Sequence, residues 1–157
     1  MPRDERHTAT IPYGTLGIIP LSSCAKMGEK VDKYLVEWRE QREHDNASAL
    51  SFAGYKRDSY ILDAKTPRFG SGEGKGVLND SIRGCDLYIM VDVCNYSIEY
   101  SLCGFKNRMS PDDHYQDLKR IIAAATGKAR RINVIMPFLY ERRQHKRTRR
   151  ESLDCAL

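Results

Sequence analysis

The sequence predicts an α/β fold built on a parallel sheet, and two kinds of segment carry that prediction. Apolar runs with the length and composition of buried strands occupy residues 13–21, 86–93 and 131–137. Segments with the periodicity of amphipathic helices occupy residues 25–43 and 110–126 and separate these runs. Strands that alternate with helices form parallel sheets, because each helix carries the chain back to the start of the next strand.

The first strand and helix form a β-α opening. Ser22 or Ser23 follows the strand and offers an N-cap, since a serine hydroxyl can accept a hydrogen bond from the backbone N–H groups that open a helix. Apolar residues then recur at three- and four-residue steps, which predicts that one stripe of the helix faces a core. The stripe comprises Met27, Val31, Tyr34, Leu35 and Trp38.

The middle of the chain is less regular. Residues 44–59 are polar without a sustained period, so we expect a loop or an insertion there. Residues 60–65, Tyr-Ile-Leu-Asp-Ala-Lys, have the composition of a short strand. Glycine then occupies every second position of residues 70–76, which weakens a strand and allows close approach of a ligand or a partner.

A Walker phosphate loop is one interpretation of this glycine-rich run, because it contains the pair Gly74-Lys75. The Walker pattern also requires a glycine separated from that pair by four residues, and a Ser or Thr directly after it. Phe69 and Gly76 occupy those two positions. A flexible turn or hairpin is therefore predicted instead, apart from the family motif described below.

The second half of the chain begins with the clearest central strand, at residues 86–93, which is apolar without alternation, as in strands covered on both faces. A loop through Cys103 and Gly104 is expected next. Ser110-Pro-Asp-Asp then begins a helix with an N-cap, a proline at the first position and acids in the first turn. Its expected apolar face comprises Tyr115, Leu118, Ile121, Ile122 and Ala125, and Gly127 is expected to end it.

Composition limits the class of protein. The chain has 157 residues, of which 41% are hydrophobic, and this suffices for one domain with a core. We expect no secretion and no membrane insertion, since there is neither an apolar run near 18 residues nor a charged-then-apolar leader. The five cysteines form no Cys-x-x-Cys pair, which favours reduced thiols in a cytoplasmic protein over a disulfide framework or a zinc site.

Positive charge is concentrated near the end of the sequence. Between Glu141 and Glu151 six Lys or Arg stand against two Glu, and the other residues carry 20 basic and 19 acidic side chains. A strand that stops at a proline and delivers arginines at its carboxyl end indicates a phosphate site. A solvated basic tail and a nucleic-acid arm are the alternatives, although only Phe138 and Tyr140 precede the basic residues as aromatic neighbours.

Four segments resemble ribose-phosphate pyrophosphokinases, the enzymes that make phosphoribosyl pyrophosphate. Arg68-Phe-Gly-Ser-Gly-Glu and then Asn79-Asp-Ser-Ile-Arg-Gly-Cys-Asp-Leu-Tyr-Ile resemble the family's Arg-Phe-Ser-Asp-Gly-Glu and Asn-Glu-Ser-Val-Arg-Gly-x-Asp-Val-Phe-Ile, at the same spacing. Residues 117–125 are similar to the family helix Asp-Ala-Leu-Lys-Arg-Ala-Ser-Ala, and residues 136–151 to its strand end and Arg-Gln pair. The resemblance implies a Rossmann-like, phosphoribosyltransferase-type N-terminal domain.

The resemblance also implies an ATP site. By position, Phe69 corresponds to the phenylalanine that stacks on adenine and Glu73 to an acid of that site, which reaches into a neighbouring subunit. Arg143 and Gln144 fall on the pair that holds ATP. Ser71 and His145 each stand where the family has Asp. The predicted ATP-binding residues are Phe69, Ser71, Glu73, Arg143, Gln144, His145, Lys146 and Arg147, with no catalytic residue and no metal ligand among them.

The implied reaction transfers the diphosphoryl group of ATP to ribose 5-phosphate, with magnesium screening the phosphates. In the family the metal-binding histidine, the loop that grips the ribose phosphate and the catalytic loop all lie beyond the Arg-Gln segment. We therefore expect residues 1–157 to be a single partial N-terminal domain, inactive alone, with residues 1–12 disordered. Its expected partners are ATP, further copies of itself or a full-length homologue, and ribose 5-phosphate only when a C-terminal half is supplied.

Two other functions stay open on the sequence. A non-catalytic regulatory or assembly subunit, or a gene fragment, would explain altered residues in the ATP motifs together with a missing ribose-phosphate half. A basic nucleic-acid-binding module would bind in a salt-dependent manner that ATP does not compete away. Asp112-Asp113-His114 could suggest a metal cluster, but at a helix start these residues are better explained as cap and dipole residues.

Overall fold

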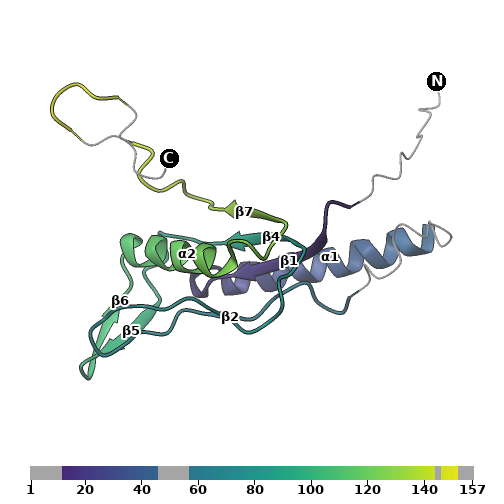
Figure 1. Ribbon diagram of the computed structural model, residues 1–157, viewed down its shortest axis with the longest axis horizontal. Helices are drawn as coiled ribbons and strands as arrows, with labels where there is room; N and C mark the ends of the chain where they lie inside the picture. Colours follow the sequence, from purple (N-terminus) through teal and green to yellow (C-terminus); the bar gives the residue numbers. More distant parts are fainter. Residues whose placement is uncertain (1–11, 46–56, 144–145, 152–157) are drawn as a thin grey trace.

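The computed structural model describes residues 12–45, 57–143 and 146–151 (Figure 1). Residues 1–11 of the segment expected to be disordered, and residues 46–56 of the loop expected at 44–59, fall outside these ranges. In chain order the elements are β1 (Thr15–Pro20), the 3₁₀ turn η1 (Ser22–Cys24), α1 (Ala25–Asp45), β2 (Ala64–Lys65), β3 (Val77–Leu78), β4 (Cys85–Met90), β5 (Glu99–Leu102), β6 (Phe105–Arg108), α2 (Pro111–Ala125) and β7 (Arg131–Ile135).

A parallel sheet in the order β1-β4-β7 forms the centre of the fold, which confirms the α/β prediction. The segment 60–62 extends this sheet beyond β1, where Ile18 N donates to Tyr60 O at 2.8 Å and Leu62 N donates to Ile18 O at 2.8 Å. The chain thus adds to one edge of β1 first and to the other edge afterwards. Such a reversal of strand order is where open α/β sheets bind ligands, beyond the carboxyl ends of the strands.

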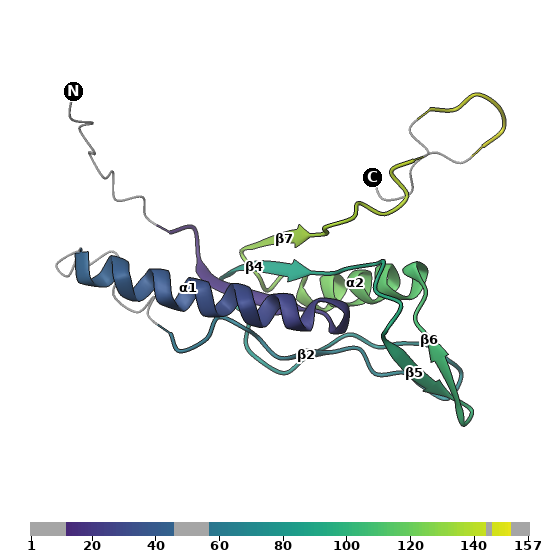
Figure 2. The ribbon, with the colours of Figure 1, turned by 180° about the vertical axis from the view of Figure 1, so that it is seen from behind.

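The two long helices cover opposite faces of this sheet. Ile19 and Leu87 point to the face that packs on α2, through Ile121, whereas Ile18 and Met90 belong to the cluster under α1. Figure 1 shows α2 in front of the sheet, and Figure 2, from behind, shows α1 in front. Cover on both faces explains why β4 is apolar without alternation.

The side of α1 that packs against the sheet differs from the predicted side. Its packed side includes Gly28, where an added Cβ would lie 2.4 Å from Pro20 Cβ, and Asp32, which accepts from Tyr60 N at 2.7 Å. The partly buried Val31, Leu35 and Val36 complete this side. Met27, Tyr34 and Trp38 are exposed, so the predicted core stripe is correct only for its other members.

The predicted serine cap of the first helix is wrong. A 3₁₀ turn precedes α1, and Leu21, the residue before that turn, makes no side-chain capping hydrogen bond. Ser23 Oγ instead accepts from Asp92 N at 3.0 Å and joins the carboxyl ends of β1 and β4.

The loop expected through Cys103 and Gly104 is instead part of a β-hairpin. β5 and β6 pair antiparallel, from Glu99 opposite Arg108 to Leu102 opposite Phe105. Cys103 and Gly104 form its two-residue turn with φ of +51° and +84°. Positive φ at both central residues matches a type I′ turn, which normally carries Asn-Gly or Asp-Gly. Because a cysteine occupies the first central position, the sequence did not predict this turn.

The second helix confirms its predicted capping. Ser110 Oγ accepts from Asp113 N, and the Asp113 carboxylate accepts from Ser110 N, which is a complete capping box. Gly127, just after the helix, has a φ of +76°, the left-handed conformation in which helices commonly end. Leu118, Ile121 and Ala125 are buried, as the periodicity predicts.

The last strand lies at an edge of the sheet in the described part of the chain. Its Arg131 is cross-strand from Asp86, and Arg131 Nε donates to Asp86 Oδ1 at 2.8 Å. Hydrogen bonding from Arg131 lowers the pKa of Asp86 below its usual value. Val134 and Ile135 are exposed on this strand.

Among the described residues no helix has the length and hydropathy needed to cross a membrane.

Candidate functional site

The glycine-rich run forms a tight turn at the end of a narrow antiparallel pair. Arg68 and Gly74 are bridged, Phe69 N donates to Glu73 O at 2.7 Å, and Gly72 N donates to Phe69 O at 2.9 Å. Gly72 has a φ of +91°, which a side chain would disfavour. The prediction of a turn or hairpin is confirmed, and it leaves the Phe69 side chain 54% exposed.

The two polar residues of this turn pair with each other. Ser71 Oγ donates to Glu73 Oε2 at 3.0 Å. A serine at this position thus supplies no charge of its own, and its hydroxyl proton is directed at the neighbouring carboxylate. Glu73 remains the acid of the turn, while Phe69 is its apolar surface.

A buried ion pair attaches the base of the turn to α2. Arg68 donates to both oxygens of Asp117, at 2.5 and 3.0 Å, and the two side chains are only 7% and 5% exposed. Arg120 Nη1 also donates to Asp117 Oδ1, at 2.6 Å. Asp117 is not among the predicted site residues. It nevertheless determines where the Phe69 turn sits, because a two-pronged guanidinium contact fixes orientation as well as distance.

The basic segment is anchored at a different point, by Tyr140. Its backbone N donates to Met136 Sδ at 3.3 Å, its hydroxyl donates to Asp112 Oδ1, and its ring centroid lies 5.1 Å from that of Tyr115. The hydrogen bond to Asp112 is the main cause that raises the pKa of Tyr140 to about 12. Asp113 serves in the cap, as predicted, whereas Asp112 accepts from this tyrosine.

Directly after Tyr140 the chain turns and presents its arginines. Glu141 has a φ of +60°, and Arg142, Arg143, Lys146 and Arg147 are exposed. In Figure 1 this segment is the yellow trace that leaves the sheet beyond β7. Gln144 and His145, two of the predicted ATP-binding residues, lie outside the described residues.

Among the described residues, a single chain does not bring the Phe69 turn and the arginines that follow Tyr140 together. Both lie at the end of the molecule to which the arrows of β4 and β7 point, but the yellow segment and the β5–β6 hairpin lie on opposite sides in Figures 1 and 2. The turn contacts that hairpin, since Cys103 Sγ donates to Gly70 O at 3.6 Å. For Phe69, Ser71 and Glu73, the hydrogen bonds of the described structure stay within the turn.

The carboxyl ends of β1 and β4 hold a second cluster that sequence reasoning missed. Asn95 Nδ2 donates to Ser23 O at 2.9 Å, and His114 Nε2 lies 2.9 Å from Asn95 O. His114 is 2% exposed. Burial also raises the pKa of Cys24, the residue after Ser23, to about 11. These contacts close the reversal point of the sheet with internal hydrogen bonds. Asp92, an acid within the apolar run 86–93, was the available signal for this cluster.

The described part of the chain contains no cluster of metal-binding side chains. No three His, Cys, Asp or Glu side chains there are grouped closely enough to hold a metal ion. The described cysteines, Cys24, Cys85, Cys94 and Cys103, are not paired in disulfides.

Comparison with known proteins gives one family and one fold. Residues 16–157 match the family model for the N-terminal domain of ribose phosphate pyrophosphokinase. The crystal structure of phosphoribosylpyrophosphate synthetase from Mycobacterium smegmatis matches with a TM-score of 0.53 and 18% sequence identity, over 88% of this chain and 35% of that one. At that identity the match shows a shared fold, and the present chain spans about a third of that protein's length. No curated protein matches.

Proposed function

This chain belongs to the ribose phosphate pyrophosphokinase family through its N-terminal domain, and we propose that it forms the ATP side of a ribose-phosphate diphosphokinase. The observation that carries the proposal is the half-exposed Phe69 ring, presented on a turn whose base is held by the buried Arg68–Asp117 pair. A base stacks well on a ring that is both rigidly placed and open to solvent.

The basic segment supplies the charge that a triphosphate needs. Diphosphoryl transfer depends mainly on positioning and on electrostatic stabilisation of the phosphates. Arg143 can contact two phosphate oxygens at once, whereas Lys146 and Arg147 act as positive charge near them. Gln144 contributes an amide, and His145 a ring nitrogen, to the same segment.

We place the complete ATP site between two copies of the chain. The Phe69 turn and the Arg143 segment diverge within one chain, so a neighbouring copy is the simplest source of the missing half. The family resemblance supports this arrangement, because there the phenylalanine turn reaches into the site of a neighbouring subunit.

The proposal includes inactivity of the chain alone in the full reaction. Ribose 5-phosphate and the magnesium ligands belong to the part of the family enzyme that lies beyond the Arg-Gln segment. With ATP, ribose 5-phosphate and magnesium, we expect no AMP release above background from the isolated chain. Addition of a full-length homologue is the matched positive sample, and robust turnover by the chain alone would refute the expectation.

A regulatory or assembly subunit is the second candidate, and the state of Ser71 favours it. The family acid is absent at this position, and the hydroxyl that replaces it is directed at Glu73. Such a subunit would bind nucleotide and co-purify with a complete enzyme without adding activity of its own. Stoichiometric co-purification would favour this candidate over a site used in catalysis.

Calorimetric titration of the full chain with ATP and magnesium tests the proposed function. Phe69→Ala should weaken binding about tenfold, as loss of one base–aromatic stack does. Arg143→Ala should weaken it by a similar factor, about tenfold, through loss of a charge-assisted phosphate contact. Tyr34→Ala and Lys33→Ala, on exposed positions of α1, are matched controls for an aromatic ring and for a positive charge. Absence of ATP binding by the unaltered chain would contradict the proposal.

A further inference from the structure

The β5–β6 hairpin has two chemically different faces. Cross-strand pairs share a face, and the register pairs Leu102 with Phe105 and Tyr100 with Asn107. The opposite face carries the charged side chains Glu99, Lys106 and Arg108, which are exposed. Alternation thus gives the hairpin one apolar side and one solvated side.

The apolar side of the hairpin supports the Phe69 turn along its length. The Arg68 guanidinium carbon lies 5.2 Å from the centre of the Tyr100 ring. Gly72 packs against Leu102, because a Cβ added to this glycine would lie 3.5 Å from Leu102 Cδ2. The thiol of Cys103, which donates to Gly70 O, makes a third contact. Together the three contacts hold the turn against the hairpin.

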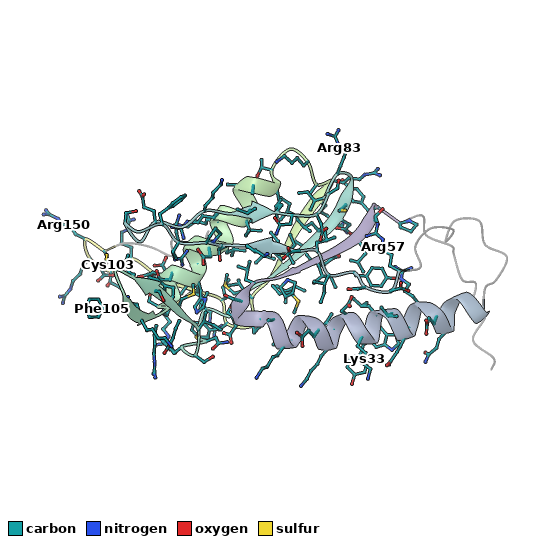
Figure 3. All side chains as sticks on the ribbon, turned by 90° about the horizontal axis from the view of Figure 1, so that it is seen from below. Lys33, Arg57, Arg83, Cys103, Phe105 and Arg150 are labelled. Carbon is teal, nitrogen blue, oxygen red and sulfur yellow. The ribbon has the colours of Figure 1, made fainter. Side chains whose placement is uncertain are left out.

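Phe105 continues the same face beyond those contacts. It is cross-strand from Leu102, yet its ring is 74% exposed, so the turn does not cover it. Figure 3 shows Cys103 and Phe105 together at one end of the molecule, far from Lys33 on α1. Cys103, which contacts Gly70, is therefore two positions from the exposed ring of Phe105. Gly70 in turn directly follows Phe69, whose ring is also exposed.

The turn has one carboxylate fewer for holding a base than the motif it resembles. Ser71 has no charge, and its hydroxyl donates to Glu73. Aromatic faces bind any base, since every base has a π-face, and each stacked ring adds affinity. A second ring next to the turn would therefore compensate for weaker polar contacts to the base.

We propose that the β5–β6 hairpin is a wall of the nucleotide site and that Phe105 is a second aromatic contact for a purine base. This inference rests on the proposed ATP site and deepens it. The hairpin then has two roles, because Tyr100 and Leu102 position the turn while Phe105 touches the ligand. Phe105 acts on the base and has no role toward the phosphates.

A polyphosphate ligand that has no base distinguishes two roles of the hairpin. If Phe105 contacts the base, its loss affects only ATP; if the hairpin only supports the turn, its loss affects both ligands. The full-length chain is titrated by calorimetry with ATP and with inorganic tripolyphosphate, each with magnesium. Phe105→Ala should weaken ATP binding roughly five- to tenfold and change tripolyphosphate binding less than about twofold. Ser101→Ala, on the opposite face of the same hairpin, is the control and should change neither.

Each other outcome has a defined meaning. Equal losses for both ligands would overturn the proposal, because the hairpin would then act on the site as a whole. Unchanged ATP binding by Phe105→Ala, with weakened binding by Phe69→Ala, would overturn this inference and leave the ATP site intact. If Phe105→Ala misfolds, Phe105→Leu keeps an apolar side chain without a ring, and its binding of ATP at the original affinity would also refute the proposal. Failure of the unaltered chain to bind ATP would refute both.

Discussion

At the scale of single residues, Asp117 is a buried carboxylate that depends on its ion pairs. Its carboxylate is 5% exposed and accepts from two arginines, one of which carries the Phe69 turn. Removing one member of a buried ion pair leaves the other charged and desolvated, and this costs more than the intact pair contributes. The stability of the domain and the placement of the turn therefore depend on the same atoms.

Asp117→Asn should lower the free energy of unfolding by about 3 kcal/mol, because Arg68 would stay buried without its counter-charge. Urea denaturation followed by circular dichroism measures this change. Glu37→Gln is the control, since Glu37 pairs with Lys33 at 3.9 Å on the solvent side of α1. That exposed pair should contribute less than about 0.5 kcal/mol. Equal effects of the two substitutions would contradict the assigned role of Asp117.

Tyr140 gives a pH-dependent test of how the basic segment is anchored. Its pKa is raised to about 12, mainly by its hydrogen bond to Asp112, from the value near 10 typical of free tyrosine. A raised pKa means that the hydrogen bond stabilises the fold below pH 10 and that this stabilisation is lost as pH rises toward 12. The neutral phenol is the donor, so deprotonation places two negative groups together.

The phenolate absorbance of the chain, measured against pH with Tyr140→Phe as reference, should show one tyrosine that titrates near pH 12. Asp112→Asn should move this titration back toward the ordinary value, about 10, because the carboxylate is its main cause. A Tyr140 that titrates with the ordinary tyrosines in the unaltered chain would show that Asp112 does not hold it.

At the scale of elements, α1 shows how a periodic sequence can be assigned the wrong face. Apolar residues cover more of its circumference than the sheet can contact, so the three- and four-residue steps fit two overlapping stripes. The stripe that packs contains Gly28, whose missing side chain lets the helix approach Pro20. Close approach of backbone, and not the size of the side chains, therefore decides the orientation of this helix.

Trp38→Ala should lower the free energy of unfolding by less than about 1 kcal/mol, because its side chain is 59% exposed and its ring centroid lies 6.2 Å from that of the equally exposed Tyr34. Ile121→Ala in α2 should lower it by about 3 kcal/mol, since that side chain is fully buried. Urea denaturation compares the two. A larger loss for Trp38 than for Ile121 would show that the exposed side of α1 is packed in solution.

The β5–β6 hairpin is the element that the sequence hid. Its strands alternate correctly, but the turn residues Cys103 and Gly104 lack the asparagine or aspartate that marks a type I′ turn. Each strand has four residues, which is too short to be distinguished from a loop by pattern alone. Contacts with the Phe69 turn stabilise the hairpin, and these contacts cannot be read from the sequence of the hairpin itself.

At the scale of the whole molecule, the reversal of strand order at β1 determines where function can lie. Strands added on both edges leave the carboxyl ends of β1 and β4 side by side, and the segments that follow the strands gather at that end. The Phe69 turn and the basic segment are both there, on opposite sides. A site that needs both groups therefore needs a second chain, if the arrangement within one chain is kept.

Subunit complementation tests that consequence. A mixture of Phe69→Ala and Arg143→Ala chains, unfolded together and refolded, should regain about a quarter of the high-affinity ATP sites, because half of the random dimers contain one intact site. Each variant alone is the control and should show none. A mixture that regains no sites, although the chains associate, would place the turn and the arginines of each site in the same chain.

The sequence by itself determined the α/β class, the strands near residues 15–20, 85–90 and 131–135, the second helix with its cap, and the exposed turn that carries Phe69. These features depend on local periodicity, capping and turn chemistry, which neighbouring residues specify. Tertiary structure alone decided the order of the strands, the face that α1 buries, the Arg68–Asp117 pair and the hairpin under the turn. Each of these joins residues far apart in the chain, and their contact energies exist only after the chain has folded.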